Sequence, residues 1–342
     1  MRLDTGRGTG RGTLGGMRSL PYVTGAAAAV AAVVLTAVPA AAEDSDSGFT
    51  IKDPRITESS GLAASRAHPG VYWTHNDQDE PRVFAVDSRT GETVATVTLS
   101  GVGKPRDMEA ISVGPDGNVY VGDIGDNLNG SWDHVWIYRF PEPKALGNIT
   151  VRATQFTVKY ADGARNAEAL MVDPTTGRVY IASKNEDGGG LYEGPATLSA
   201  ARTNVFRRIG EVPWVTDGAF SPDGKELVLR SYFSARGYEW KGGKLGADHR
   251  VSAPIQGQAE SVTYTRDGKA LMFGTEGEQS EVERVALGKD SVSGGGERKS
   301  PSGTGSSAAG GGSDKNTFTY GLIGLAFATA LVLGVKRLLR RD

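Results

Sequence analysis

The stretch EAISVGPDGNVYVG, residues 109–122, decides the fold. A short apolar run with a small residue in second place leads into a Pro-Asp-Gly turn and a second apolar run. Because Gly supplies the positive φ that a tight hairpin turn needs, the stretch predicts two antiparallel strands. The same pattern recurs in SSGLAASRAHPGVYWT (59–74), EALMVDPTTGRVYIA (168–182), DGAFSPDGKELVLR (217–230) and ESVTYTRDGKALMFG (260–274).

The spacing of these five stretches predicts a β-propeller. Their equivalent positions are 60, 109, 168, 217 and 260, which leaves room for about four strands per repeat. The last repeat has only three strands before the chain becomes Gly-rich, whereas FTIKDPRI (49–56) precedes the first repeat. We therefore expect an all-β, five-bladed β-propeller with strand-exchange closure, in which 49–56 supplies the missing outer strand. The alternatives are a sixth blade that starts at 49–56, or a β-sandwich with coincidental turns.

Composition narrows the function classes. The 342 residues carry a net charge of -2, which argues against a general nucleic-acid binder. The chain has no Cys, which excludes disulfides, thiolate metal sites and a Cys nucleophile. It has 48 Gly and 15 Pro, which favours many short strands over long helices.

The N-terminus is predicted to be a targeting segment. Residues 25–42, GAAAAVAAVVLTAVPAAA, form an apolar run that ends on Ala-x-Ala. This predicts a secretory signal peptide over 1–42, cleaved after Ala42. Met17 offers a second start, and a retained membrane anchor is the alternative.

The C-terminus is predicted to be a membrane anchor. Residues 317–335, TFTYGLIGLAFATALVLGV, are long and apolar enough for a transmembrane helix, and the basic tail 336–342 places that end in the cytoplasm. Residues 291–316 are Gly/Ser-rich and predict a flexible stalk. We therefore expect a single-pass plasma-membrane protein whose propeller, residues 43–290, is extracellular and monomeric.

The starts of the five inner strands form the predicted metal site. The residues at the equivalent position are Ser60, Glu109, Glu168, Asp217 and Glu260, each followed by a small residue. Around one axis, four carboxylates need a counter-charge or protons. An all-oxygen set suits Ca²⁺. The alternative is that each acid only accepts hydrogen bonds from backbone amides.

This series resembles the blade starts of the calcium-activated nucleotidases (apyrases). The resemblance implies a five-bladed propeller with an axial Ca²⁺ at the five positions above, although Asp217 stands where that family has Ser. The propeller as a whole resembles uncharacterised, secreted WD40-like proteins of high-GC Gram-positive bacteria, on the strength of WTHND (73–77), GDIGDN (122–127) and NAEAL (166–170). That second resemblance implies no activity.

The ends of the second strands add polar groups to the same face. Arg106, Lys184 and Arg230 are candidates to bind phosphate or carboxylate oxygens. His75, Asp77 and Asp123 are weak candidates for a general base. For each of them, a solvated loop side chain is the alternative.

Three function classes stay open at this point. A surface-anchored binding module with an axial Ca²⁺ and an unknown extracellular ligand is the main expectation, because no nucleophile–base constellation is evident. A Ca²⁺-dependent phosphoanhydride or phosphoester hydrolase is the first alternative. A glycosidase that uses a carboxylate pair is the second.

Overall fold

The computed structural model describes residues 46–78, 80–128, 130–185 and 188–288. In those ranges the chain forms strands and turns without a helix. A helix able to cross a membrane is accordingly not found among them. The predicted signal peptide, the stalk, the transmembrane segment and the basic tail lie outside the described residues, and their predictions stand as made.

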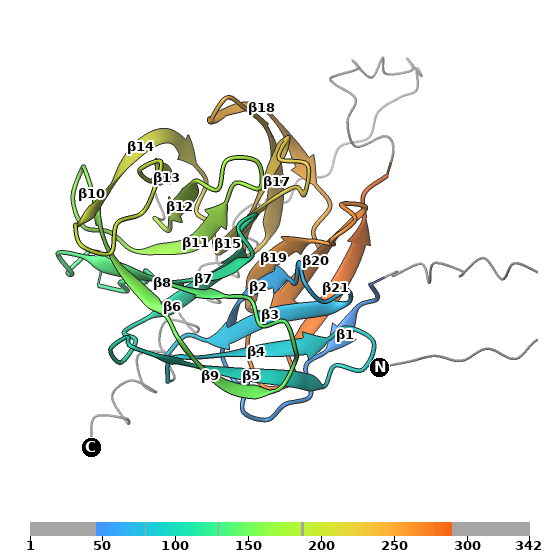
Figure 1. The fold of residues 1–342 in the computed structure, drawn as a ribbon. Helices are drawn as coiled ribbons and strands as arrows, with labels where there is room; N and C mark the ends of the chain where they lie inside the picture. The colour runs from blue at the N-terminus through green and yellow to red at the C-terminus, as the bar shows by residue number, and fades with distance from the viewer. Residues whose placement is uncertain (1–45, 79, 129, 186–187, 289–342) are drawn as a thin grey trace, which may run out of the picture. The chain divides into compact units, whose positions relative to one another are not determined.

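Five strands form the innermost ring of a propeller-like fold. Each contacts the next along the chain, and the last contacts the first. In Figure 1 their labels gather around the middle of the molecule, while the outer strands lie at its periphery. They are β2 (Ser59–Ala64), β6 (Met108–Val113), β11 (Ala167–Val172), β15 (Asp217–Phe220) and β19 (Ala259–Tyr264).

Each inner strand begins an antiparallel unit that runs outward. The second strands are β3 (Val71–Asn76), β7 (Asn118–Asp123), β12 (Val179–Ser183), β16 (Glu226–Ser231) and β20 (Ala270–Thr275). The third are β4 (Arg82–Asp87), β8 (Val135–Pro141), β13 (Gly189–Glu193), β17 (Ser234–Lys241) and β21 (Glu281–Ala286). The fourth, in the first four units, are β5 (Thr93–Ser100), β10 (Thr154–Tyr160), β14 (Asn204–Val212) and β18 (Lys244–Val251).

The turns between first and second strands are the ones that the sequence predicts. Gly70, Gly117, Gly177, Gly224 and Gly268 occupy them with φ of 72°, 71°, 71°, 69° and 70°. These near-identical positive values show that the five turns are structurally equivalent. Apolar clusters fill the spaces between neighbouring units, as where Trp73 of β3 packs with Ile111 of β6 and Tyr138 of β8.

Two pairings were not expected from the sequence. β10 pairs in parallel with β14, which joins the second and third units into one eight-stranded sheet. β9 (Asn148–Arg152) pairs in parallel with β5, as a fifth strand of the first unit. Both pairings cover outer edges whose backbone groups would otherwise be unpaired.

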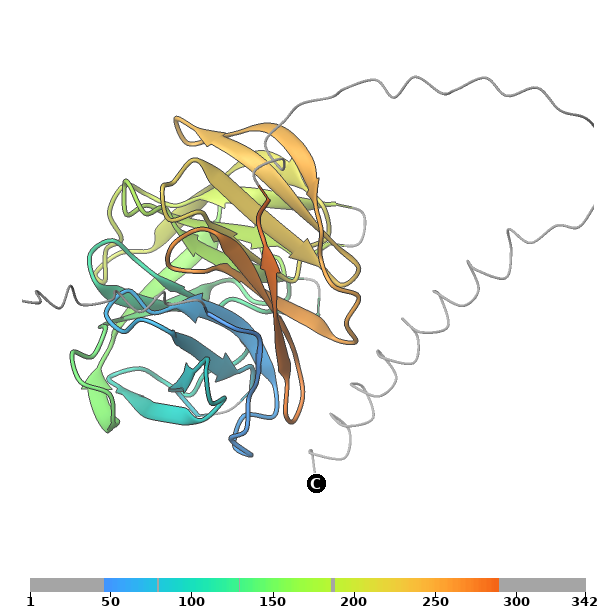
Figure 2. The same cartoon turned by 90° about the vertical axis from the view of Figure 1, so that its right-hand side faces the viewer.

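The segment before the first unit closes the ring. β1 (Phe49–Thr50) pairs with β21 of the last unit, with Phe49 opposite Val282. Figure 2 shows the blue first strands beside the orange last strands. The expected exchange of an outer strand is therefore confirmed, although the ladder covers two residues rather than the whole of 49–56.

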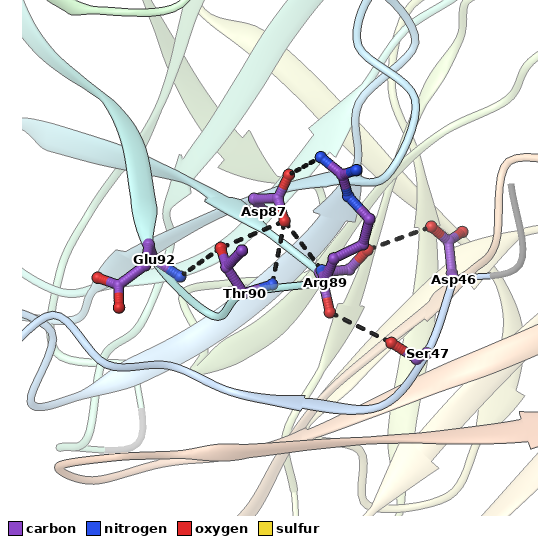
Figure 3. Close-up of polar contacts among 7 residues, drawn as sticks. Asp46, Ser47, Asp87, Arg89, Thr90 and Glu92 are labelled. Carbon is purple, nitrogen blue, oxygen red and sulfur yellow. Dashed lines mark hydrogen bonds and ion pairs between the residues drawn. The ribbon is translucent and has the colours of Figure 1, made fainter.

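Polar contacts to the first unit hold this segment in place (Figure 3). Asp87 accepts hydrogen bonds from the amides of Arg89 and Thr90 and so shapes the β4–β5 turn. The Ser47 hydroxyl donates to the carbonyl of Ser88 in that turn, over 3.4 Å. Because β1 bonds to the last unit while its flanks bond to the first, it links the two ends of the propeller.

Candidate functional site

An acidic cluster lies at the face where the inner strands begin and the second strands end. We use this name for Glu58, Asp77, Asp107, Glu109, Glu168 and Glu260. The charges of Glu58 and Asp107 act on Asp77, and those of Asp77, Asp107 and Glu168 act on Glu109. The charge of Glu168 also acts on Glu260. The cluster therefore spans four of the five units.

β-bulges aim three of these carboxylates. The register of the inner pair shifts between Met108 and Ala110, between Ala167 and Ala169, and between Ala259 and Ser261. The residues passed over are Glu109, Glu168 and Glu260. A bulge leaves its extra residue out of the ladder and re-aims its side chain.

Asp217 is not aimed in this way. The β15–β16 ladder is regular, with Asp217 directly opposite Arg230. Its carboxylate accepts hydrogen bonds from the amides of Gly218 (2.7 Å) and Val262 (2.8 Å). Burial raises the pKa of this carboxyl, while the two amide donors oppose the rise. For this residue the alternative, an acid that bonds backbone amides, describes the structure.

Lys184 supplies a positive charge inside the cluster. Its Nζ lies 2.5 Å from Oε1 of Glu168 and 2.8 Å from the hydroxyl of Tyr232. Burial alone would lower the pKa of Lys184, but Glu168, Glu260 and Glu109 outweigh it and hold the pKa well above its ordinary value. The side chain is therefore an ammonium group. Burial raises the pKa of Glu168, and the contact with Lys184 opposes that rise.

The groups as arranged do not fit an axial metal ion. Asp217 accepts hydrogen bonds from backbone amides, and Glu168 is paired with Lys184. The Ser60 hydroxyl donates to the carbonyl of Glu58 over 3.4 Å. Across the described ranges, no group of three or more His, Asp or Glu side chains is placed to hold a metal. An axial Ca²⁺ stays a prediction from the sequence, and no chemistry below uses it.

Asp77 and Glu58 form a hydrogen-bonded carboxyl pair at the rim of the cluster. Burial, the bond to Glu58 and the charges of Glu58 and Asp107 raise the pKa of Asp77 to about 9. A carboxyl this close disfavours the ionised form of Asp77, which therefore keeps its proton. Both residues are partly exposed, unlike the buried Glu109. The pair therefore lies where the cluster meets the solvent, although the Oδ1 atom of Asp77 is itself buried.

The carboxyls on the other side of the cluster also have raised pKa values. Burial raises the pKa of Glu109 well above its ordinary value, and the charges of Glu168, Asp107 and Asp77 add to the rise. Burial raises the pKa of Glu260 to about 8, against the opposing charge of Lys184. Gly125 leaves the room for this packing, because a Cβ there would stand 2.6 Å from Asp107 Oδ2 and 2.7 Å from Glu109 Oε1.

Two of the three expected anion-binding cations are committed elsewhere. Arg230 is 1% exposed, and its guanidinium donates to the carbonyls of Ser261 and Gly274. The guanidinium of Arg106 lies between the rings of Trp132 and Trp136, 4.1 and 3.8 Å from their centroids. With Lys184 bound to Glu168, the face has no cation of the expected set available to phosphate.

Two of the three candidate bases are structural. His75 is fully buried, its pKa is lowered by burial to about 4, and its Nε2 packs against Gly61. Asp123 is fully buried and accepts hydrogen bonds from the amides of Arg106 and Asp107. Only Asp77 reaches the rim.

Sequence reasoning missed Glu58 and Asp107. Each lies two residues before an equivalent axial position, in the first and second repeats, where the third repeat has Asn166. Comparison of that position across the repeats would have shown the second row of polar groups.

The comparisons with known proteins give similar solved structures and no family. No family model and no curated protein matches the chain. Among solved structures it is similar to a gluconolactonase from Xanthomonas campestris (TM-score 0.42, 13% identity, covering 69% of this chain and 89% of that one). It is also similar to a putatively assigned 6-phosphogluconolactonase from Bacteroides fragilis (0.41, 13%, 71% and 71%) and to the PQQ-bound aldose sugar dehydrogenase of Streptomyces coelicolor (0.40, 13%, 70% and 98%).

The expectation of a non-catalytic binding module is corrected by these comparisons. By their descriptions the three similar structures are two lactonases and a dehydrogenase, so the expectation of a non-catalytic module is not retained. At such identities the likeness shows a propeller-like fold alone. The choice of reaction therefore depends on the side chains of this chain.

Proposed function

We propose that the protein is a hydrolase that adds water to the carbonyl of a neutral ester or lactone, with Asp77 and Glu58 as its acid–base pair. The observation that carries this is the hydrogen bond between these two carboxyls at the rim of the acidic cluster, together with the raised pKa of Asp77. A singly protonated carboxyl pair holds a donor and an acceptor side by side. Because the pKa of Asp77 is about 9, the pair keeps its proton at neutral pH.

In each step of the reaction, one carboxyl of the pair gives a proton and the other takes one. Glu58 takes a proton from water as the water oxygen bonds to the carbonyl carbon, and Asp77 gives its proton to the carbonyl oxygen. When the tetrahedral intermediate collapses, Glu58 gives its proton to the leaving oxygen as the carbon–oxygen bond to that group breaks, and Asp77 takes back the proton of the hydroxyl that becomes the carbonyl. The products are a carboxylic acid and an alcohol, and the pair returns to its starting state.

The charge of the site favours a neutral substrate. Lys184, the ammonium group of the cluster, has Glu168, Glu260 and Glu109 around it and is bound to Glu168. The charged oxygens of a phosphoanhydride would therefore find no cation of the expected set free to bind them. A glycosidase needs its two carboxyls about 5 Å apart or more, whereas Asp77 and Glu58 are hydrogen-bonded to each other.

We also propose that the ring is a five-bladed propeller. This is supported by the five equivalent Gly turns, by the ring of inner strands and by the completion of the last unit by β1. On this architecture the acidic cluster lies on the axis, at one mouth of the central channel.

The test is a substrate panel with the full-length protein. We expect hydrolysis of neutral esters or sugar lactones, and none of nitrophenyl glycosides or nucleotides. Asp77→Asn and Glu58→Gln should each lower kcat/KM by about 10²–10⁴-fold, because each removes one member of the pair. Glu92→Gln, an exposed residue paired with Lys52, is the matched control and should change nothing. Cleavage of nucleotides or glycosides instead of esters would show that the proposed reaction is wrong.

A further inference from the structure

A cavity opens on the face opposite the acidic cluster, where the inner strands end. Its volume is about 400 Å³, within the range of small-molecule pockets. Residues from all five inner strands or the turns that follow them line it. The lining combines apolar side chains, Leu62, Val113 and Phe220 among them, with the polar residues Ser112 and Thr263.

The mouth of this cavity has two different sides. The second residue after each inner strand is Pro115, Pro174 and Pro222 in the middle three units, but Arg66 and Arg266 in the first and last. Because the first and last units are neighbours in the ring, the two arginines follow adjacent strands, β2 and β19. The mouth therefore has a cationic side and an apolar side.

Packing against the next unit occupies the three prolines, which leaves the two arginines to contact a ligand. Each Pro lies near the Gly turn of the next unit: Pro115 near Gly177, Pro174 near Gly224, and Pro222 near Gly268. Gly117 forms the turn of the second unit, next to the unit that carries Arg66, and a Cβ there would have no atom within 4 Å.

The two guanidinium groups are not neutralised within the described structure. Arg66 and Arg266 are exposed, line the cavity, and have no hydrogen bond or ion pair with another described residue. Asp267 lies next to Arg266 in the chain, but its carboxylate pairs with Lys269 and accepts from Thr265. The cationic side of the mouth is therefore open to an anion from outside.

We infer that this cavity binds a small amphipathic carboxylate, with its apolar body in the channel and its carboxylate against Arg66 and Arg266. Guanidinium groups bind carboxylates through charge-assisted, often bidentate, hydrogen bonds. The apolar side chains of the lining, Leu62, Val113 and Phe220 among them, offer contacts to a hydrocarbon or aromatic body. This site is separate from the acidic cluster and does not depend on the proposed hydrolase activity.

The test is calorimetric titration of the full-length protein with octanoate. Octanol and octylamine probe the role of the charge, and acetate probes the role of the apolar body. We expect octanoate to bind at least about tenfold more tightly than the other three, which corresponds to about 1.4 kcal/mol. Equal binding of octanoate and octanol would overturn the assignment of the arginines, and no binding of octanoate would overturn the site.

Variants separate the two sides of the site. Arg66→Gln with Arg266→Gln should lower octanoate affinity about tenfold or more and leave octanol binding unchanged. Ala64→Phe, which fills the channel without a change of charge, should lower octanoate affinity as well. Arg250→Gln, an exposed arginine of β18, is the control and should bind as the wild type does. Far-UV spectra and melting establish that each variant is folded, and a folded double arginine variant with wild-type affinity would contradict the inference.

Discussion

Lys184→Met tests the charge balance of the acidic cluster. Methionine keeps the length of the side chain and removes its positive charge, which leaves Glu168, Glu260 and Glu109 without the ammonium group that they surround. The Lys184 and Glu168 side chains are 15% and 4% exposed and their charged atoms are 2.5 Å apart, so the value for a buried pair applies. Removal of one partner from such a pair costs about 3–5 kcal/mol.

The loss should depend on pH. Without Lys184, the cluster carboxyls can fold only with more protons bound, so their pKa values rise further above those in the unfolded chain. A carboxyl with a raised folded pKa stabilises the fold at low pH, and that contribution is lost as pH rises. We expect a loss of about 3–5 kcal/mol at pH 8 and a clearly smaller one at pH 5.

Chemical denaturation of the full-length protein at both pH values measures this. Lys225→Met removes an exposed lysine whose partner Asp223 is also exposed, and should stay within about 0.5 kcal/mol of the wild type. Glu168→Gln in the Lys184→Met background should restore part of the loss, because it removes the stranded charge. If Lys184→Met is no more destabilising than Lys225→Met at pH 8, the ammonium does not balance the cluster.

Three further outcomes follow from the site. Gly125→Ala should destabilise the protein by about 1–3 kcal/mol, because the new Cβ meets two carboxylate oxygens within 2.7 Å. Gly103→Ala, whose Cβ would have no atom within 4 Å, should leave the stability unchanged, and the melting temperatures of the two variants test this. The free energy of unfolding should fall as pH rises from about 4 towards 9, because Asp77 and Glu260, with pKa values of about 9 and 8, hold protons more tightly in the folded state. A denaturant series at several pH values measures this, and Glu260→Gln should make the free energy depend less on pH. A wild-type free energy of unfolding that rises over this range would contradict the prediction. Chelator and millimolar Ca²⁺ should give the same melting temperature, because Lys184 already supplies the counter-charge; a rise with Ca²⁺ would favour the axial ion instead.

Turn chemistry made the architecture predictable from the sequence. The five Gly turns require positive φ and repeat in phase, so the sequence indicates the hairpins and their order. The parallel pairings of β9 with β5 and of β10 with β14 depend on which outer edges meet in space. No local residue pattern reports that meeting.

The candidate site was predictable in position but less so in detail. The sequence indicates that Glu109, Glu168, Asp217 and Glu260 are equivalent, yet only a bulge separates the three that enter the cluster from Asp217, which stays in a regular ladder. The length of Lys184 lets it reach Glu168, a positive charge that the carboxylate series alone does not indicate. Such contacts follow from side-chain reach in three dimensions rather than from spacing along the chain.

The most direct test of the proposed function is the pH dependence of kcat/KM for a neutral lactone, measured on the wild type and on Asp77→Asn. We predict that wild-type activity persists through neutral pH and falls above about pH 9, where Asp77 loses its proton. Asp77→Asn should be at least about 100-fold less active and should lack that alkaline limb. An Asp77→Asn variant with wild-type activity and an unchanged pH profile would contradict the assignment of Asp77 as the acid.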